Sequence, residues 1–166
     1  MPGQAKPIPE GFHTVTPYLV VHDAAKAIDF YKQAFDATVK VRMDGPPGKI
    51  GHAELQIGDS VIMLADEMPQ METKAPQSLG GTTTGIFLYV KDVDAAFGKA
   101  VGAGAKVTMP VADMFWGDRY GKLMDPFGHS WSMATHKEDV APEEMKKRMQ
   151  TAMGAKQSEQ KTKTAS

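Results

Sequence analysis

The chain has 166 residues and a formal net charge of −1, with 19 basic and 20 acidic side chains. This length allows one domain with a sizeable core, and the balanced charge gives no long-range attraction to nucleic acid or to an anionic membrane. The absence of cysteine excludes disulfides, thiolate nucleophiles and cysteine-ligated zinc, so any metal site would need His, Asp or Glu. Without a signal-peptide pattern or a run of roughly 20 apolar residues, we expect a cytoplasmic protein that binds neither nucleic acid nor membrane.

The first predicted feature is an extended arm over residues 1–12, which contain three prolines. The segment "TPYLVV" then predicts a strand, and Asp23 is placed to cap the helix that follows it. Four residues recur at helical spacing and should form the buried stripe of this helix: Ala27, Ile28, Tyr31 and Phe35. After a second strand in "AFDATV", the alternating run "HAELQIGDSVIML" predicts a hairpin. This first unit, about 14–66, therefore follows a β-α-β-β-β pattern.

A second unit, about 84–137, repeats the first. Asp92 aligns with Asp23 at an offset of 69 residues, which also pairs "SVIML" with "HSWSM". Because one offset holds over about 45 residues, a duplication explains the pattern better than chance. Here the hairpin turn is Asp-Pro-Phe-Gly, a typical turn sequence. The predicted fold class is α+β, with duplicated βαβββ units in a single domain over 13–137.

A helix is predicted after the two units, over 138–154. Pro142 suits its first turn, and three methionines follow at i, i+4 and i+8: Met145, Met149 and Met153. We expect this stripe to dock on the domain or on a partner subunit. The remaining residues, 155–166, are polar and low in complexity, and are expected to be disordered.

The paired units and their motifs resemble a known family. The segments "VVHDAAKAIDFYKQAF", "GHAELQIGDSVIMLADE" and "WGDRYGKLMDPFGHSWSMATHKEDVAPEEMKKR" are similar to the vicinal oxygen chelate superfamily, and above all to PhnB-like members of its glyoxalase/bleomycin-resistance group. The resemblance covers about 13–148. It implies that each unit curls into a half-barrel and that the half-barrels enclose a cleft, often at a dimer interface. The superfamily hosts metal-dependent isomerases, extradiol dioxygenases, fosfomycin-modifying enzymes and metal-free drug-binding proteins, so the fold alone does not choose a function.

The resemblance also implies where metal ligands would lie, namely at the start of the first strand and the middle of the last strand of each unit. In this sequence those positions hold Thr16 and Met63 in the first unit, and Gly85 and Ser132 in the second. A glycine, a soft thioether and two neutral hydroxyls do not suit a divalent cation. We therefore expect no metal cofactor at these positions.

Four other polar residues are candidate metal ligands. His129 and His136 are seven residues apart, so on an unbroken strand they point to opposite faces and cannot share one ion. We expect His129 to pack beside the turn, and His136 to lie at a strand end facing the cleft mouth or solvent. His52 and Glu54 share one strand face, where they either contact a ligand or form a polar pair on a wet surface.

The stretch "MFWGDRYG" is the strongest candidate for ligand binding. Alternation places Trp116, Asp118 and Tyr120 on one face, opposite Phe115 and Arg119. Aromatic rings can stack on a planar or cationic ligand, and charged groups can orient a polar one. The alternative interpretation is a core tryptophan next to a surface ion pair.

Three functions remain open, and whether the chain is an enzyme is left undecided. The first is a small-molecule-binding protein without a metal, acting as a homodimer on a small organic molecule. The second is a metal-dependent lyase, isomerase or dioxygenase with ligands relocated to His52, Glu54 and His136. The third is a non-catalytic interaction module that uses the methionine stripe. The candidate ligand-binding residues are Tyr18, His52, Glu54, Met63, Trp116, Asp118, Tyr120 and Ser132.

Overall fold

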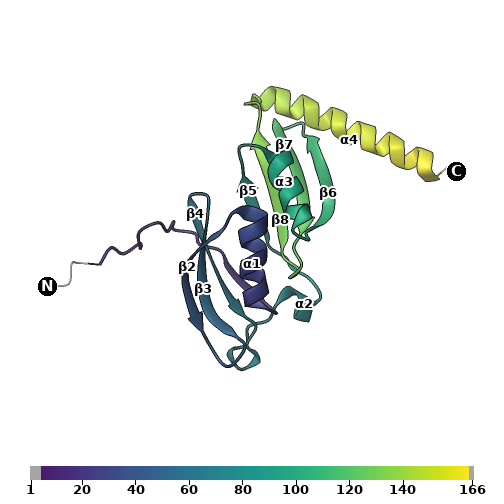
Figure 1. Ribbon diagram of the computed structural model, residues 1–166. Coiled ribbons are helices and arrows are strands. Elements are labelled where there is room, and N and C mark those ends of the chain that lie inside the picture. Colours follow the sequence, from purple (N-terminus) through teal and green to yellow (C-terminus); the bar gives the residue numbers. More distant parts are fainter. Residues whose placement is uncertain (1–4, 165–166) are drawn as a thin grey trace.

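The computed structural model describes the backbone of residues 5–164 and the side chains of residues 5–155. It contains two four-stranded sheets, each with one helix across it (Figure 1). The first unit comprises β1 (Tyr18–Val21), α1 (Ala24–Phe35), β2 (Thr38–Asp44), β3 (Ile50–Ile57) and β4 (Ser60–Asp66). The linker holds a short turn, η1 (Pro69–Met71), and α2 (Pro76–Leu79). The second unit comprises β5 (Gly85–Tyr89), α3 (Val93–Gly102), β6 (Lys106–Asp113), β7 (Asp118–Met124) and β8 (Ser130–His136), and α4 (Pro142–Thr164) follows it.

The two sheets have the same topology, which confirms the predicted duplicated α+β fold. Their strand orders are β1-β4-β3-β2 and β5-β8-β7-β6, with the first pair parallel in each. Tyr18 lies opposite Met63, and Phe87 lies opposite Ser132, so 87 − 18 and 132 − 63 both give 69. Each sheet is thus built on the register that the sequence predicts.

The predicted helix caps are present in both units. The Asp23 carboxylate accepts a hydrogen bond from the backbone N–H of Lys26 at 3.1 Å, and Asp92 accepts one from Ala95 at 3.0 Å. Such caps satisfy one of the backbone donors that a helix leaves unpaired at its start. The same local signal therefore starts α1 and α3.

The third strand of the second unit departs from the simple repeat. Glu54 faces Met63, but Lys122 faces Ser132, so on this strand the offset is 122 − 54, which gives 68. The longer turn between β7 and β8 accounts for the shift of one residue. As a result Tyr120, and not Gly121, takes the place that His52 holds in the first unit.

One hydrophobic core runs through both units. The predicted stripe of α1 is buried, including Tyr31 and Phe35. The Phe35 ring lies 4.4 Å from the ring of Trp131 on β8, and Tyr31 lies 5.3 Å from it, centroid to centroid. Helices α1 and α3 also pack against each other. Because aromatic side chains bury large apolar areas, this shared cluster packs the two units against each other.

A buried carboxylate connects the units at the same place. Asp125, in the turn between β7 and β8, is 3% exposed. It accepts hydrogen bonds from Tyr31 Oη at 2.7 Å and Trp131 Nε1 at 2.9 Å. The backbone N–H groups of Phe127 and His129 supply two more, each at 2.9 Å. The turn therefore also anchors the second unit to α1 of the first.

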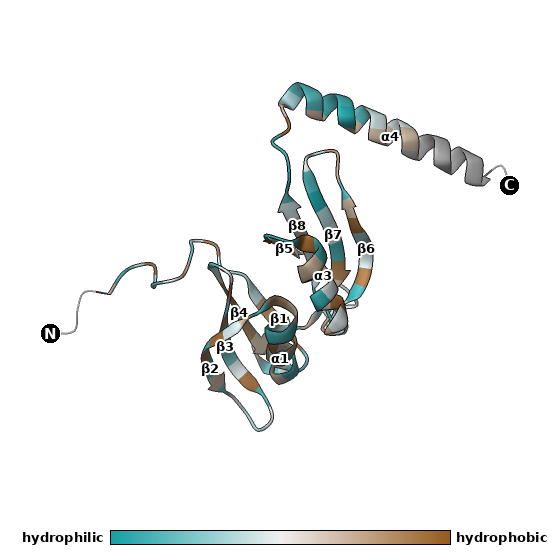
Figure 2. Ribbon diagram, turned by 45° about the horizontal axis from the view of Figure 1, so that its top comes forward, coloured by the Kyte–Doolittle hydropathy of each residue, from teal (hydrophilic) through white to brown (hydrophobic). Residues whose placement is uncertain are grey.

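Helix α4 extends away from the domain (Figures 1 and 2). On this helix the side chain of Arg148 forms hydrogen bonds to Glu138 and Glu144, and the side chains of Met149 and Met153 are exposed. The structure continues this helix to residue 164, whereas the sequence predicted its end at 154 and a disordered tail after it. The helix extends further because the straight-chain residues Lys, Gln and Glu favour helix. Of the helices in the described residues, none combines the length and hydrophobicity needed to cross a membrane.

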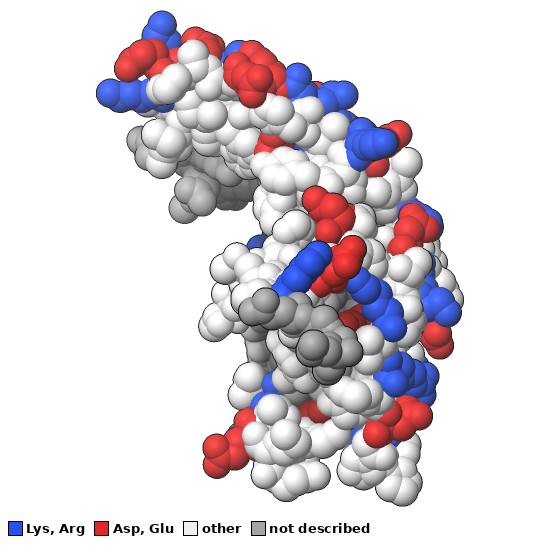
Figure 3. Space-filling view, turned by 90° about the vertical axis from the view of Figure 1, so that its left-hand side faces the viewer, with Lys and Arg blue, Asp and Glu red and all other residues white. Residues whose placement is uncertain are grey.

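Surface charge is mixed. On the face drawn in Figure 3, acidic and basic side chains are interspersed along the described part of the chain. This pattern agrees with the formal net charge of −1.

Candidate functional site

The eight candidate residues fall into two groups, one on each sheet. In both units the side chains that alternate with the core point away from α1 and α3, and we call this side of each sheet its open face. The open face of the first unit carries Tyr18, His52, Glu54 and Met63. That of the second unit carries Trp116, Asp118, Tyr120 and Ser132. Within one chain, the two groups belong to separate sheets.

On the open face of the first unit, the polar residues bind one another. His52 Nε2 lies 3.3 Å from Glu54 Oε1, and His52 Nδ1 lies 3.4 Å from the Tyr18 hydroxyl. Met63 sits between Tyr18 and Glu54 in the register of the sheet. The strand β2 adds Val41 beside Glu54. The result is a polar pair within a partly apolar surface.

On the open face of the second unit, the central group is Asp118. Its side chain is 5% exposed, and burying an unpaired carboxylate would be costly. Three donors compensate: Trp116 Nε1 at 3.0 Å and Tyr89 Oη at 3.2 Å, both to Oδ2, and His136 Nδ1 at 2.7 Å to Oδ1. His136 Nε2 is also 2.9 Å from Asp139 Oδ1. Hydrogen bonds to Asp118 and then to Asp139 raise the pKa of His136 above its ordinary value.

Four aromatic rings surround this carboxylate and form what we call the aromatic row: Tyr89, Phe87, Tyr120 and Trp116. The ring centroids of Tyr89 and Phe87 are 4.9 Å apart, those of Phe87 and Tyr120 are 5.7 Å apart, and those of Tyr120 and Trp116 are 5.7 Å apart. The Tyr120 hydroxyl lies 2.9 Å from Ser132 Oγ. Phe87 is 47% exposed and Tyr89 is 66% exposed, so the row presents ring surface to solvent.

Sequence reasoning missed Phe87 and Tyr89. The offset of 69 could have found Phe87, because it takes the place of Tyr18. Arg119 lies on the side opposite the row, as alternation predicts, and binds Asp94 at 2.6 and 2.7 Å. It therefore cannot pair with Asp118 to orient a ligand.

Cavities lie at both ends of the aromatic row. One of about 820 Å³ is lined by Phe87 and Tyr89, together with the end of α1, the turn between β3 and β4, and α3. The other, of about 360 Å³, is lined by Trp116 and His136, and by Met145 at the start of α4. The rings are thus accessible from two sides.

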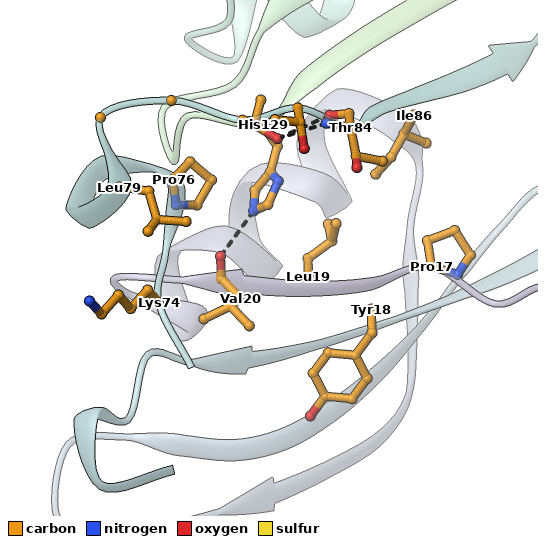
Figure 4. Close-up of a pocket in the computed structure, with 14 residues that line it drawn as sticks. Pro17, Tyr18, Leu19, Val20, Lys74, Pro76, Leu79, Thr84, Ile86 and His129 are labelled. Atoms are coloured by element: carbon orange, nitrogen blue, oxygen red, sulfur yellow. Dashed lines mark hydrogen bonds between the residues drawn. The ribbon is translucent and has the colours of Figure 1, made fainter. Parts of the chain in front are cut away.

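A third cavity, of about 630 Å³, lies between β1, the linker and β5 (Figure 4). His129 points into it, and its Nε2 lies 3.0 Å from the Val20 carbonyl oxygen (Figure 4). Tyr18 contributes to the lining, but its ring lies on the other side of β1 from His129. His129 thus ties the turn of the second unit to β1, in agreement with the structural role inferred for it, while His136 faces the row.

The residues at the metal-ligand positions of the family do not fit a divalent cation. The Thr16 hydroxyl donates to the His13 carbonyl, and the Ser132 hydroxyl binds Tyr120. Within residues 5–155, no three His, Asp or Glu side chains cluster as a metal site requires. Within one chain the relocated ligand set is not brought together either, because His52 and Glu54 lie on one sheet and His136 on the other.

Comparison with known proteins identifies the family. The sequence model of the Glyoxalase/Bleomycin resistance protein/Dioxygenase superfamily matches residues 11–133. The chain therefore belongs to this superfamily, also known as the vicinal oxygen chelate superfamily. Uncharacterized protein Rv0887c of Mycobacterium tuberculosis is 49% identical over 138 residues, which cover 81% of this chain and 81% of that protein.

Solved structures show the same fold. TioX from Micromonospora sp. ML1 has a TM-score of 0.59 at 28% identity, and the match covers 75% of this chain and 98% of TioX. The PhnB protein from Bacillus cereus has a TM-score of 0.58 at 18% identity, covering 74% of this chain and 99% of that protein. At that identity the second likeness shows the fold alone.

Proposed function

We propose that the chain is a small-molecule-binding protein of this superfamily, and that the aromatic row is its main contact surface. The observation that carries the proposal is the exposure of Phe87 and Tyr89 beside Trp116 and the buried Asp118. Contiguous exposed rings with a few fixed polar groups are typical of ligand sites. A planar organic molecule could stack on such rings, with each aromatic contact contributing about 1 kcal/mol.

The proposed binding does not depend on a metal. Thr16, Met63, Gly85 and Ser132 offer neither charge nor imidazole to a divalent ion, whereas stable sites use such ligands. Met63 supplies a soft, polarisable surface that suits an organic ligand. Within this proposal the protein is cytoplasmic, and its ligand-binding residues are the eight predicted ones with Phe87 and Tyr89 added.

We also propose that a second copy of the chain covers the open faces. Each face exposes apolar side chains: Tyr18 and Met43 on the first unit, Phe87 and Tyr89 on the second. In a homodimer, the first unit of one copy would lie over the second unit of its partner and enclose the aromatic row. Glu54 and Lys122 support this pairing, because they hold the same place in their sheets and carry opposite charges.

The ligand site is tested by Trp116→Ala. A thermal-shift screen of planar aromatic compounds and metal salts supplies a probe, and its Kd is then measured for wild type and variant. We expect the variant to bind roughly tenfold more weakly, because one ring contact and its buried area are lost. Its stability should fall only by about 1–3 kcal/mol, for the hydrogen bond that Trp116 gives to Asp118. Normal binding, or a collapse of thermal stability, would place Trp116 in the core and the site elsewhere. Stoichiometric metal in untagged protein would contradict metal-independent binding.

A second candidate function is binding of another protein through α4. The exposure of Met149 (40%) and Met153 (58%) on a helix that extends from the domain favours it. Deletion of 141–166 tests this function. It should abolish capture of the partner and preserve binding of the planar probe if the two surfaces are separate.

A further inference from the structure

The imidazole of His136 is held between two carboxylates. Its Nδ1 lies 2.7 Å from Asp118 Oδ1, and its Nε2 lies 2.9 Å from Asp139 Oδ1. An ionised carboxylate only accepts hydrogen bonds, so both ring nitrogens must donate. This geometry is that of an imidazolium, which carries a full positive charge.

The charged groups that act on His136 come from two elements. Asp118 lies on β7, and Asp139 lies in the connection between β8 and α4. Tyr89, on β5, reaches the same pair through its hydroxyl bond to Asp118. The other residues that line the adjoining cavity carry no charge: Trp116, Val140, Ala141 and Met145.

Asp118 places a negative charge directly behind the aromatic row. The carboxylate accepts hydrogen bonds from Trp116 and Tyr89, the rings at the two ends of the row. Because it is buried, its field is weakly screened and acts on any molecule that stacks on the rings. An unbalanced carboxylate would add to the attraction that aromatic faces already have for cations. The imidazolium of His136 balances this charge.

We propose that His136 determines the charge selectivity of the ligand site. Its imidazolium balances Asp118 so that the aromatic row accepts neutral planar molecules, and loss of its proton makes the row selective for organic cations. This inference rests on the proposed function, since it names the class of ligand for that same surface.

The strand end that carries His136 is fixed in place. The backbone N–H groups of Lys137 and Glu138 both donate to the Gly117 carbonyl, at 2.9 and 3.0 Å. Gly117 has a φ of +100°, and a Cβ at this position would lie 2.1 Å from the Glu138 carbonyl oxygen. Only glycine permits this close approach. The backbone that carries His136 is therefore held beside Asp118.

The raised pKa of His136 gives the direction of the pH effect. Below that pKa the imidazolium is present and the row favours neutral molecules. As the pH rises through it, the positive charge of the imidazolium is lost, so preference for a cation should increase. The change should fall above the ordinary histidine value of about 6.5.

The test uses two probes of the same shape: 1-methylnaphthalene, which is neutral at every pH, and 1-methylquinolinium, which carries a permanent charge. Calorimetry gives the ratio of their Kd values for the full chain, from about pH 5.5 to pH 9, the range that brackets a raised histidine pKa. His136→Gln keeps a donor but no charge, and should shift preference toward the cation about tenfold at the acidic end. His136→Arg keeps a positive charge throughout this range, so at every pH it should hold the ratio that the wild type shows at the acidic end.

His13→Gln is the matched control, because His13 precedes β1 and its ring bonds the Asp59 carbonyl; it should behave as wild type. If both probes bind and neither His136→Gln nor a rise in pH changes the ratio, the inference is overturned and the proposed function stands. If neither probe binds the wild type, both fail together. The pH series on wild type decides the matter even if a variant folds poorly.

Discussion

Tyr31 and Asp125 show how much one buried pair can determine. The Tyr31 hydroxyl on α1 donates a hydrogen bond to Asp125 in the turn of the second unit. This is the shortest of the four hydrogen bonds that the Asp125 carboxylate accepts. Burial first, and then the nearby Asp125 charge, raise the pKa of Tyr31 well above its ordinary value. The neutral phenol is therefore strongly preferred in the folded protein.

This preference predicts a loss of stability in alkali. A group whose pKa is raised on folding stabilises the fold fully below its unfolded pKa, and that contribution is lost as the pH rises above it. Denaturant unfolding should show falling stability above about pH 10, the unfolded tyrosine value. Tyr31→Phe should flatten this dependence and cost about 1 kcal/mol near neutral pH, since one hydrogen bond is lost. If the stability of the variant fell equally steeply in alkali, the loss of stability would have to come from another tyrosine.

For single residues, the sequence predicted the strand face of a side chain better than its hydrogen-bond partners. The odd spacing of His129 and His136 placed them on opposite sides of β8, and they do bind different groups. Periodicity could not show that Asp118 is buried, because its three donors come from three segments of the chain. A pattern along one strand carries no information about such convergence.

Among the elements, the starts of α1 and α3 are built alike. The first residue of α1 is Ala24, whose backbone N–H donates to Asp66, and the first residue of α3 is Val93, whose backbone N–H donates to Thr135. The two acceptors are related by the repeat offset, since 135 − 66 gives 69. The last strand of each unit thus supplies an acceptor to the helix of the same unit. Asp66 differs in accepting a second bond, from the Ile50 backbone at 2.7 Å.

Removal of these acceptors should cost unequal amounts. Asp66→Ala leaves two buried N–H groups without that acceptor, at about 1–3 kcal/mol for each. Thr135→Val removes its bonds to the Val93 N–H and the Val90 carbonyl, but both are only part-buried, so water can replace them more easily. Urea unfolding of the two variants should therefore show the larger loss for Asp66→Ala. Equal losses would mean that water replaces the carboxylate.

The elements themselves could be predicted because their signals are local. Asp23 and Asp92 mark helix starts, and alternation marks the strands. The shift of one residue on β7 could not be predicted, since it depends on how the Asp125 turn closes. The length of α4 was underestimated because its polar sequence was interpreted by composition alone.

For the whole molecule, the main prediction is a homodimer. Light scattering at micromolar concentration should give about twice the chain mass of 18.0 kDa, because two exposed apolar faces need covering. A mass near that of one chain would contradict it.

The proposed pairing of the faces can be tested by charge exchange. Glu54→Lys and Lys122→Glu should each weaken the dimer, because a like charge would then face Lys122 or Glu54 of the other copy. The double variant should recover the wild-type association constant, as measured by analytical ultracentrifugation. Recovery is not expected if these residues lie far apart in the dimer. The placement of the two units could not be predicted, since repeats define faces and not their mutual orientation.

The carboxylate of Asp125 has a consequence for how the duplicated chain folds. Each unit repeats a complete βαβββ pattern, yet the Tyr31 hydroxyl of the first bonds Asp125 of the second, and the shortest ring contact of Phe35 is with Trp131 of the second. Neither half is therefore an autonomous folding unit, in spite of their common plan. Unfolding should proceed in one cooperative transition, and a chain nicked in the linker should yield two fragments that fold only by reassociating.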